Sequence, residues 1–177
     1  MPDTLKEKGE DPFDPRRSEL RLRSRVGGGF RLEASGGGWL EVGPVDEVRR
    51  ELESSDRRHW TLRAAPASEG GGFVVETVAP DGFRELARSV RRADTGLDPW
   101  AFYLDDGRVF FAAPTMGPGA GIELHGWEAR GAYWTATPHD SCWTLAPTAA
   151  GRRLEGSEPV VVLLAAEILA GRSRLAV

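Results

Sequence analysis

WAFYLDDGRVFFAA, residues 100–113, is the stretch that says most about the fold. Two runs rich in aromatic and aliphatic residues, 100–105 and 108–113, flank an Asp106-Gly107 dipeptide. Asp-Gly between such runs is a strong sign of a β-hairpin, because a type I′ turn needs positive φ at both central residues. The two-residue turn predicts three cross-strand neighbours: Asp105 with Arg108, Tyr103 with Phe110, and Phe102 with Phe111.

A second hairpin is expected further along the chain. Residues 122–129 and 132–137 alternate around Arg130-Gly131, and another strand is expected near 142–146. A two-residue turn would pair Trp127 with Trp134. One face of this hairpin would then carry Glu123, His125, Trp127, Trp134 and Ala136.

Upstream of residue 100, strands and helices are predicted to alternate. Period-two patterns indicate strands over 20–26, 30–35, 39–42, 60–65 and 73–78. Apolar stripes at helical spacing predict helices over about 45–55 (Val45, Val48, Leu52) and 81–93 (Phe83, Leu86, Ala87, Val90). Glycine triplets and an Arg-Glu-Leu tripeptide both recur at an offset of 34 residues. This recurrence indicates either a duplicated strand–strand–helix unit or chance matches in a glycine-rich sequence.

The C-terminal region predicts one more helix. Ser157 stands at an N-cap position, Glu158 and Pro159 follow it, and Gly171 would end the helix. Residues 160–170 are apolar on nearly all sides, which is typical of a helix in the core. The alternative is that residues 160–164 begin as a buried strand.

These elements together predict an α+β fold, with a mostly antiparallel sheet built from hairpins and about three helices packed on it. Residues 1–17 read as a flexible N-terminal tail, in which Phe13 would be the anchor if the tail is ordered. Residues 18–177 form the single predicted domain. It contains two ββα-like units (18–95) followed by aromatic-rich hairpins and the C-terminal helix (96–177).

Composition excludes several classes of protein. The net charge of −4 argues against a nucleic-acid or anionic-membrane binder. The single cysteine, Cys142, excludes an internal disulfide framework and a multi-cysteine zinc site. The N-terminal 18 residues lack the apolar core of a signal peptide, and the longest apolar run, 160–166, is too short to cross a bilayer. A cytoplasmic protein that does not bind membranes is therefore expected. The absence of Asn and Gln, with two lysines beside 21 arginines, indicates a bacterial-like, GC-rich coding bias and, as the weaker alternative, a thermophilic origin.

Residues 99–148 form a segment rich in aromatic residues and poor in basic ones. They hold nine of the 15 aromatic residues but only two basic ones, Arg108 and Arg130. The functional interpretation is a binding surface made of Trp127, Trp134, His125, Glu123 and Tyr103, because indoles offer flat apolar contact area. The alternative is ordinary packing of a cross-strand tryptophan pair in the core.

Reactive residue types gather at 137–142. His139 and Cys142, with Asp140 and with His125 from the neighbouring strand, could form a mononuclear metal site. Cys142 could instead be a nucleophile with a histidine base, and Glu123 with His125 could form an acid–base pair. The alternative to all of these is a polar turn before a buried Cys142.

Arginines form two further groups. Arg21, Arg23 and Arg25 alternate along one predicted strand. Arg84, Arg88, Arg91 and Arg92 would share one face of the predicted 81–93 helix. Guanidinium groups in such rows can bind phosphates or an acidic partner. The alternative is a mixed surface, because the first 93 residues carry 17 basic and 17 acidic side chains.

The leading functional hypothesis is a non-enzymatic binding or accessory protein of the inhibitor, immunity or assembly-factor type. Its partner would be another protein or a small ligand, held by the aromatic C-terminal sheet, and no cofactor is expected. The second hypothesis is a small enzyme that uses Glu123 and His125, with His139, Asp140 and Cys142. The third is an oligomeric structural component that associates through an exposed C-terminal helix.

Overall fold

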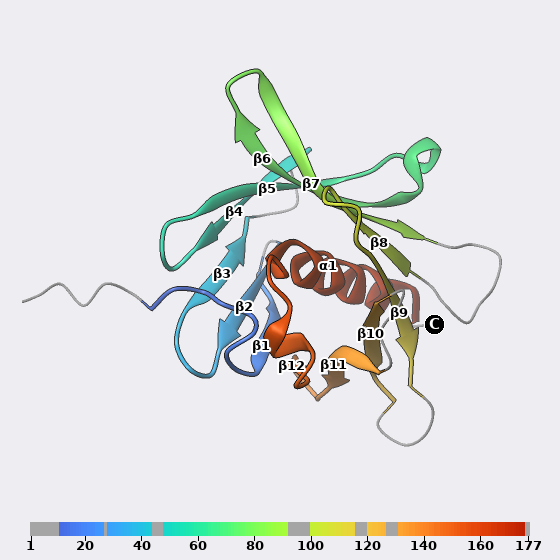
Figure 1. The fold of residues 1–177 in the computed structure, drawn as a ribbon. Coiled ribbons are helices and arrows are strands. Elements are labelled where there is room, and N and C mark those ends of the chain that lie inside the picture. Colours follow the sequence, from blue (N-terminus) through green and yellow to red (C-terminus); the bar gives the residue numbers. More distant parts are fainter. Residues whose placement is uncertain are drawn as a thin grey trace, which may run out of the picture.

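The structure is a computed structural model that describes residues 11–26, 28–43, 48–91, 100–115, 120–126 and 131–175, the last five by their backbone only. Within these residues, twelve antiparallel strands close into a barrel, and one α-helix lies in the middle of the ring (Figure 1). The strands are β1 (Leu20–Ser24), β2 (Phe30–Ala34), β3 (Trp39–Val42), β4 (Arg49–Ser54), β5 (His59–Ala64), β6 (Gly71–Ala79), β7 (Gly82–Arg91), β8 (Trp100–Leu104), β9 (Val109–Pro114), β10 (Ile122–Gly126), β11 (Ala132–Pro138) and β12 (Trp143–Pro147). The helix is α1 (Glu158–Leu175), and two short 3-10 helices are η1 (Ala67–Glu69) and η2 (Gly151–Arg153).

The topology is a simple meander. Each strand pairs with the one that follows it in the chain, and β12 returns to pair with β1 through Leu20 and Leu145. Side chains alternate along each strand, as in β1, where Leu20 and Leu22 are buried and Arg21 and Arg23 are exposed. The core therefore consists of the inner side chains of the barrel together with α1.

Helix α1 is buried on all sides. Every residue from Val160 to Ile168 is at most 4% exposed, which confirms the prediction of a core helix and excludes a strand over 160–164. The helix contacts β6, β7 and β8. Its carboxylate at Glu167 accepts hydrogen bonds from the Ser89 hydroxyl at 2.7 Å and from Arg91 Nε at 3.1 Å. This polar contact ties the helix to β7, because a buried carboxylate needs both a counter-charge and hydrogen-bond donors.

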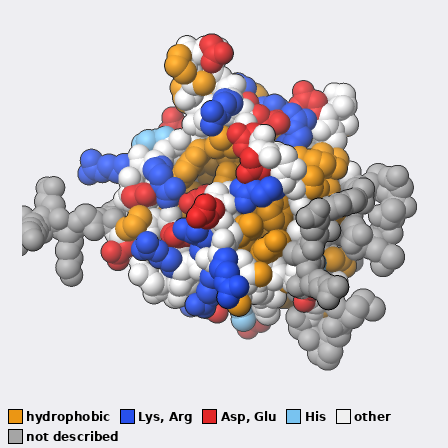
Figure 2. All heavy atoms as spheres, viewed as in Figure 1, with side chains coloured by type: hydrophobic (Ala, Val, Ile, Leu, Met, Phe, Trp, Pro, Cys, Tyr) orange, Lys and Arg blue, Asp and Glu red, His pale blue; other side chains and the backbone are white. Residues whose placement is uncertain are grey.

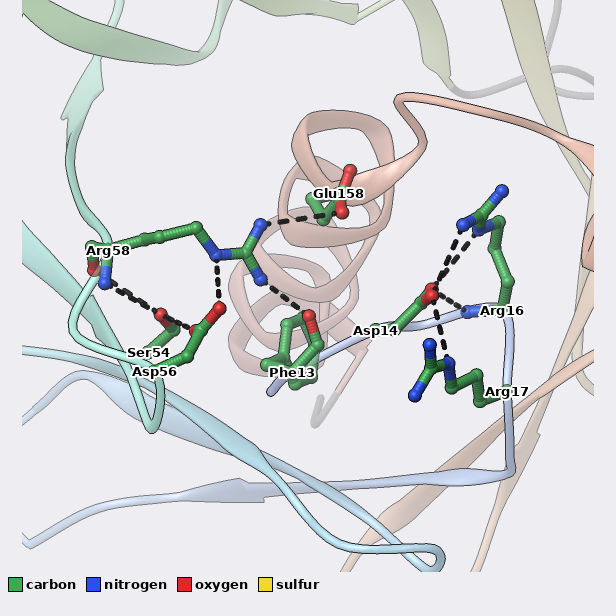
Figure 3. Close-up of polar contacts among 8 residues, drawn as sticks. All are labelled: Phe13, Asp14, Arg16, Arg17, Ser54, Asp56, Arg58 and Glu158. Atoms are coloured by element: carbon green, nitrogen blue, oxygen red, sulfur yellow. Dashed lines mark hydrogen bonds and ion pairs between the residues drawn. The ribbon is translucent and has the colours of Figure 1, made fainter. Parts of the chain in front are cut away.

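Residues 11–17, here called the N-terminal strap, lie beside the start of α1 and the turn between β4 and β5 (Figure 3). Phe13 is 1% exposed and belongs to the core. Arg58 donates a hydrogen bond to the Phe13 carbonyl at 2.5 Å and pairs with Asp56 at 2.8 Å and with Glu158 at 3.5 Å. The described part of the predicted tail thus packs on the barrel with Phe13 as its anchor, while residues 1–10 lie outside the described residues.

The α+β prediction is wrong, because the predicted helices over 45–55 and 81–93 correspond to strands β4 and β7 where they are described. In β4 only Leu52 and Ser54 are buried, two residues apart, and Val48 is 83% exposed. Pairing on both sides decides the conformation of these strands, and it overrides the weak helical stripe. Without those helices the proposed ββα duplication has no structural counterpart.

The first hairpin is confirmed, but its register is not. Phe102 lies opposite Phe110, and Tyr103 lies opposite Val109. The turn holds three residues, 105–107, because Leu104 donates to the carbonyl of Arg108 and only Gly107 has positive φ. A three-residue loop with glycine in the left-handed position is the next most common solution after the two-residue turn. The extra residue shifts the pairing by one position.

Truncation of Phe13 tests whether the strap is part of the core. We expect Phe13→Ala to lower the free energy of unfolding by roughly 3–5 kcal/mol, as for other buried phenylalanines. Chemical denaturation measures this change, with the exposed Val26→Ala as the control, which should stay within about 0.5 kcal/mol of the wild type. A loss below about 1 kcal/mol for Phe13→Ala would place the strap outside the cooperative unit.

The strap should also be acid-sensitive. Burial raises the pKa of Asp56, but its hydrogen bond with Ser54 and the nearby Arg58 outweigh burial, so the pKa lies below its ordinary value. Ionised Asp56 therefore adds stability at neutral pH, and this contribution is lost as the pH falls below about 4. We expect Asp56→Asn to be less stable than the wild type at pH 7, with the difference shrinking toward pH 2.

Thermal unfolding at a series of pH values checks this, with Asp81→Asn, at an exposed position, as the control. A stability difference for Asp56→Asn that is constant from pH 7 to pH 2 would contradict the assignment.

Candidate functional site

The outer face of the barrel is divided into a charged part and an uncharged part. On β1 to β7 the outward positions carry arginines and glutamates that form ion pairs, such as Arg31–Glu41 at 2.6 Å and Arg49–Glu76 at 3.0 Å. In Figure 2, charged side chains crowd the region that overlies β2–β5, and hydrophobic side chains are visible toward β8 and β9. Charges of both signs alternate there, so this part is a solvated surface.

The uncharged part spans β8 to β12 and is here called the uncharged wall. Its side chains point outward because they alternate with buried residues such as Phe102, Phe110 and Trp134. They are neighbours across the strands, with Tyr103 opposite Val109 and Thr137 opposite Thr144. The wall consists of Tyr103, Val109, Phe111, Ala113, Thr135, Thr137, Thr144 and Ala146.

Glu123 and His125 lie in the middle of the wall, on β10. The register places Glu123 between Ala113 and Thr135, and His125 beside Phe111. The His125 Nε2 and Glu123 Oε2 atoms are 2.9 Å apart, with 31% and 39% of the two side chains exposed. Among the outward side chains of β8–β12 that the structure describes, these two are the only acidic or basic ones.

The predicted binding residues do not all share this face. Tyr103, Glu123 and His125 lie on the outside, whereas Trp134 is fully buried in the barrel interior. Trp134 is opposite Leu124, and the register shifts by one residue between Leu124 and His125. The predicted pairing of Trp127 with Trp134 is therefore wrong, and Trp127 itself lies outside the described residues.

The reactive residues at 139–142 do not converge with His125. His139, Asp140 and Cys142 belong to the turn between β11 and β12, where the His139 N–H donates to the Cys142 carbonyl at 2.8 Å. His125 is opposite Ala132 on β11. His139 follows Ala132 by seven residues, so at strand spacing the two histidines are about 23 Å apart along the strand direction. Over the described parts of the chain, no three His, Cys, Asp or Glu side chains are grouped so that they could hold a metal ion.

The four arginines that were predicted to share one helical face over residues 84–92 do not lie on one face of the structure. Arg88 points outward to Glu85, and Arg91 points inward to Glu167. Arg84 is exposed on the hairpin between β6 and β7, and Arg92 lies outside the described residues. A strand places residues of different parity on opposite faces, so this row does not form one anion site.

A smaller exposed apolar surface, separate from the uncharged wall, lies on the β6–β7 hairpin, which projects beyond the barrel (Figure 1). Val78 and Phe83 are cross-strand neighbours, 72% and 48% exposed. The Arg49 guanidinium lies 3.9 Å from the centre of the Phe83 ring and thus covers one face of it. This pair is smaller than the uncharged wall and partly covered.

An apolar crevice lies at the barrel end beside the start of α1. It is lined by Leu40, Leu52, Trp60, Val75, Glu158, Pro159 and Val162. Sites for small molecules usually have several convergent polar groups. Six of these seven lining residues have no charge and Glu158 is the one carboxylate among them, so the crevice supports no ligand site.

Comparison of the chain with protein-family models, curated proteins and solved structures found no match. In the described part of the chain, α1 does not meet the length and hydropathy that a membrane-spanning helix requires.

Sequence reasoning missed most of the wall. Val109 and Phe111 alternate with buried residues on β9, and Thr135 and Thr137 do the same on β11. The period-two pattern of these strands was the signal that could have found them. The sequence prediction uses this pattern to place the aromatic residues on one face, and it makes no use of the small residues that alternate with them.

Two substitutions test the assignment of inner and outer faces. We expect Trp134→Ala to lower the free energy of unfolding by roughly 3–5 kcal/mol, because it leaves a cavity in the core. Tyr103→Ala should change it by less than about 1 kcal/mol, since Tyr103 is 40% exposed. Denaturant titration of both variants checks this, and equal losses would mean that Tyr103 is also a core residue.

Proposed function

We propose that this protein is a non-catalytic binding protein that holds a partner protein against the uncharged wall. The observation that carries the proposal is the composition of the wall: eight uncharged outward side chains on β8, β9, β11 and β12 surround one Glu123–His125 pair on β10, in a chain of which 28% is charged. Charged residues are depleted, and aromatic residues enriched, at the centre of protein interfaces. Tyr103 and Phe111 are the aromatic members of the wall.

The dimensions of the wall indicate a reversible complex. Strands are about 4.8 Å apart and outward residues about 6.6 Å apart, so five strands give a patch of roughly 20 by 15 Å. A stable interface needs about 800 Å² on each partner. A patch of roughly 300 Å² supports a weak or transient contact, to which neighbouring surface must contribute.

The enzyme hypothesis has weaker support. Glu123 and His125 are close enough for proton transfer, but they lie on the convex outside of the barrel. Catalytic sites are usually concave and exclude water, which strengthens their electrostatic effects. The crevice beside α1 is lined by residues of β3–β6 and α1, on elements other than β10.

Association through the C-terminal helix also has weak support. The apolar residues of α1 from Val160 to Ile168 are enclosed by the barrel. They offer no surface to a second copy of the chain unless the barrel opens. The wall is thus the better candidate for any contact with another molecule.

Site-specific photo-crosslinking tests the proposal. A benzoyl-phenylalanine residue at position 103 or 137, on the wall, should give a crosslinked adduct of discrete mass in cells that express the protein. The same residue at position 61, outward on the charged part of the barrel, is the matched control and should give none. Absence of adducts at 103 and 137, or equal yields at all three positions, would contradict the proposal.

A further inference from the structure

The two borders of the uncharged wall differ in charge. On one side, β12 is followed by β1, and the register places Arg21 directly opposite Thr144 of the wall. Arg21 and Arg23 are both exposed, and neither has an ion-pair partner among the described residues. These two guanidinium groups are therefore free cations at the edge of the wall.

The neighbouring glutamates are already engaged by other arginines. Glu33 lies opposite Arg21 in the register, but it pairs with Arg31 at 2.7 Å. Glu41 pairs with Arg31 at 2.6 Å and with Arg25 at 3.7 Å. Four arginines, Arg21, Arg23, Arg25 and Arg31, thus lie beside three glutamates, Glu33, Glu41 and the exposed Glu19 just before β1, which leaves local positive charge on a protein of net charge −4.

The opposite border of the wall is neutral. There β7 pairs with β8, and Arg88 lies opposite Tyr103 in the register. Arg88 forms a close ion pair with Glu85, which raises its pKa and holds its charge in place. A partner that covers the wall would meet a satisfied ion pair on this side and free arginines only on the side of β1.

We propose that the partner protein carries carboxylates beside its apolar contact surface, and that these meet Arg21 and Arg23 when the partner lies on the wall. This inference rests on the proposed function. Arginine forks bind carboxylates in a bidentate manner. Charges at the rim of an interface act mainly on the association rate and its salt dependence, and they fix the orientation of the partner. An acidic border would therefore orient the partner across β12 toward β1.

A protein partner fits these features better than a nucleic acid. Nucleic-acid binding needs a row of cations that follows the phosphates, and its affinity grows with their number. Here two free arginines stand beside a wall without basic residues other than His125, which is paired with Glu123. Nucleic acid remains an outcome that the experiment can reveal.

The double variant Arg21→Glu/Arg23→Glu tests the inference in the full chain with the crosslinker at position 137. That position is opposite Thr144, and Thr144 is opposite Arg21, so the probe lies about 10 Å from the arginines. The purified protein is added to cell lysate in 50 or 500 mM NaCl and irradiated briefly, so that adduct yield follows association. The matched control is Arg57→Glu/Arg84→Glu, two exposed arginines on other parts of the surface with the same change in charge.

At 50 mM NaCl we expect the Arg21→Glu/Arg23→Glu variant to give at least about threefold less adduct than the wild type, and the control variant to match the wild type. At 500 mM NaCl the difference should disappear, because salt screens exposed charges. The crosslinked partner peptide, identified by mass spectrometry, should contain Asp or Glu near the point of attachment. Thermal unfolding of both variants confirms that they are folded.

Each other outcome overturns a defined statement. Equal yields for the two double variants, or a partner segment without acidic residues, would overturn this inference and leave the proposed binding function intact. Loss of the adduct on nuclease treatment would show a nucleic-acid partner and also overturn it. No adduct at position 137 in the wild type would overturn the proposed function, and this inference with it.

Discussion

An apolar helix in the middle of the barrel determines how the strands around it must be arranged. Helix α1 has no polar side along Val160–Ala166, so it can be stable in water only if protein surrounds it in every direction. An open sheet would cover one side, whereas a closed ring of strands covers all of them. Closure also requires one apolar face on each strand, and it directs the other face to the outside. Packing therefore determines which residues occupy the inner face, whereas the residues of the outer face can vary without loss of the core.

One polar contact fixes how the helix sits in this enclosure. Glu167 needs donors in the interior, and β7 supplies them through Ser89 and Arg91. Ser89 in turn accepts a hydrogen bond from the backbone N–H of Phe73 on β6. An apolar helix could rotate or slide at little loss of burial, but a buried carboxylate cannot leave its partners. The contact thus selects one position and accounts for the packing of α1 against β6–β8.

Local pattern predicts most of the strands and the core helix, but not their closure. Alternation locates β1 and β3, and the apolar run at 160–166 indicates a buried helix. The pairing of Leu20 with Leu145 joins the two ends of the meander, and no local signal records it. Apolar residues at helical spacing, such as Val48 with Leu52 and Phe83 with Leu86, predict helices where the structure has strands β4 and β7. For the site, composition located the charge-poor segment, but the face of each side chain depends on register. An extra residue in the turn after β8 changes the partners of Phe102 and Tyr103, and a changed register between β10 and β11 places Trp134 opposite Leu124.

Closure limits how this molecule can contact another. In an open sheet an edge strand offers unpaired backbone groups, and a partner can add a strand to it. In the described barrel each strand is paired on both sides, and unpaired backbone edges occur on the hairpin that carries Val78 and Phe83. A partner of the barrel wall must therefore bind by side-chain contact, and small outward residues such as Ala113, Thr135 and Ala146 let a flat surface approach closely. Such contacts are weak one by one. In the proposed complex, orientation would then depend on charges at the border, where Arg21 and Arg23 of β1 lie.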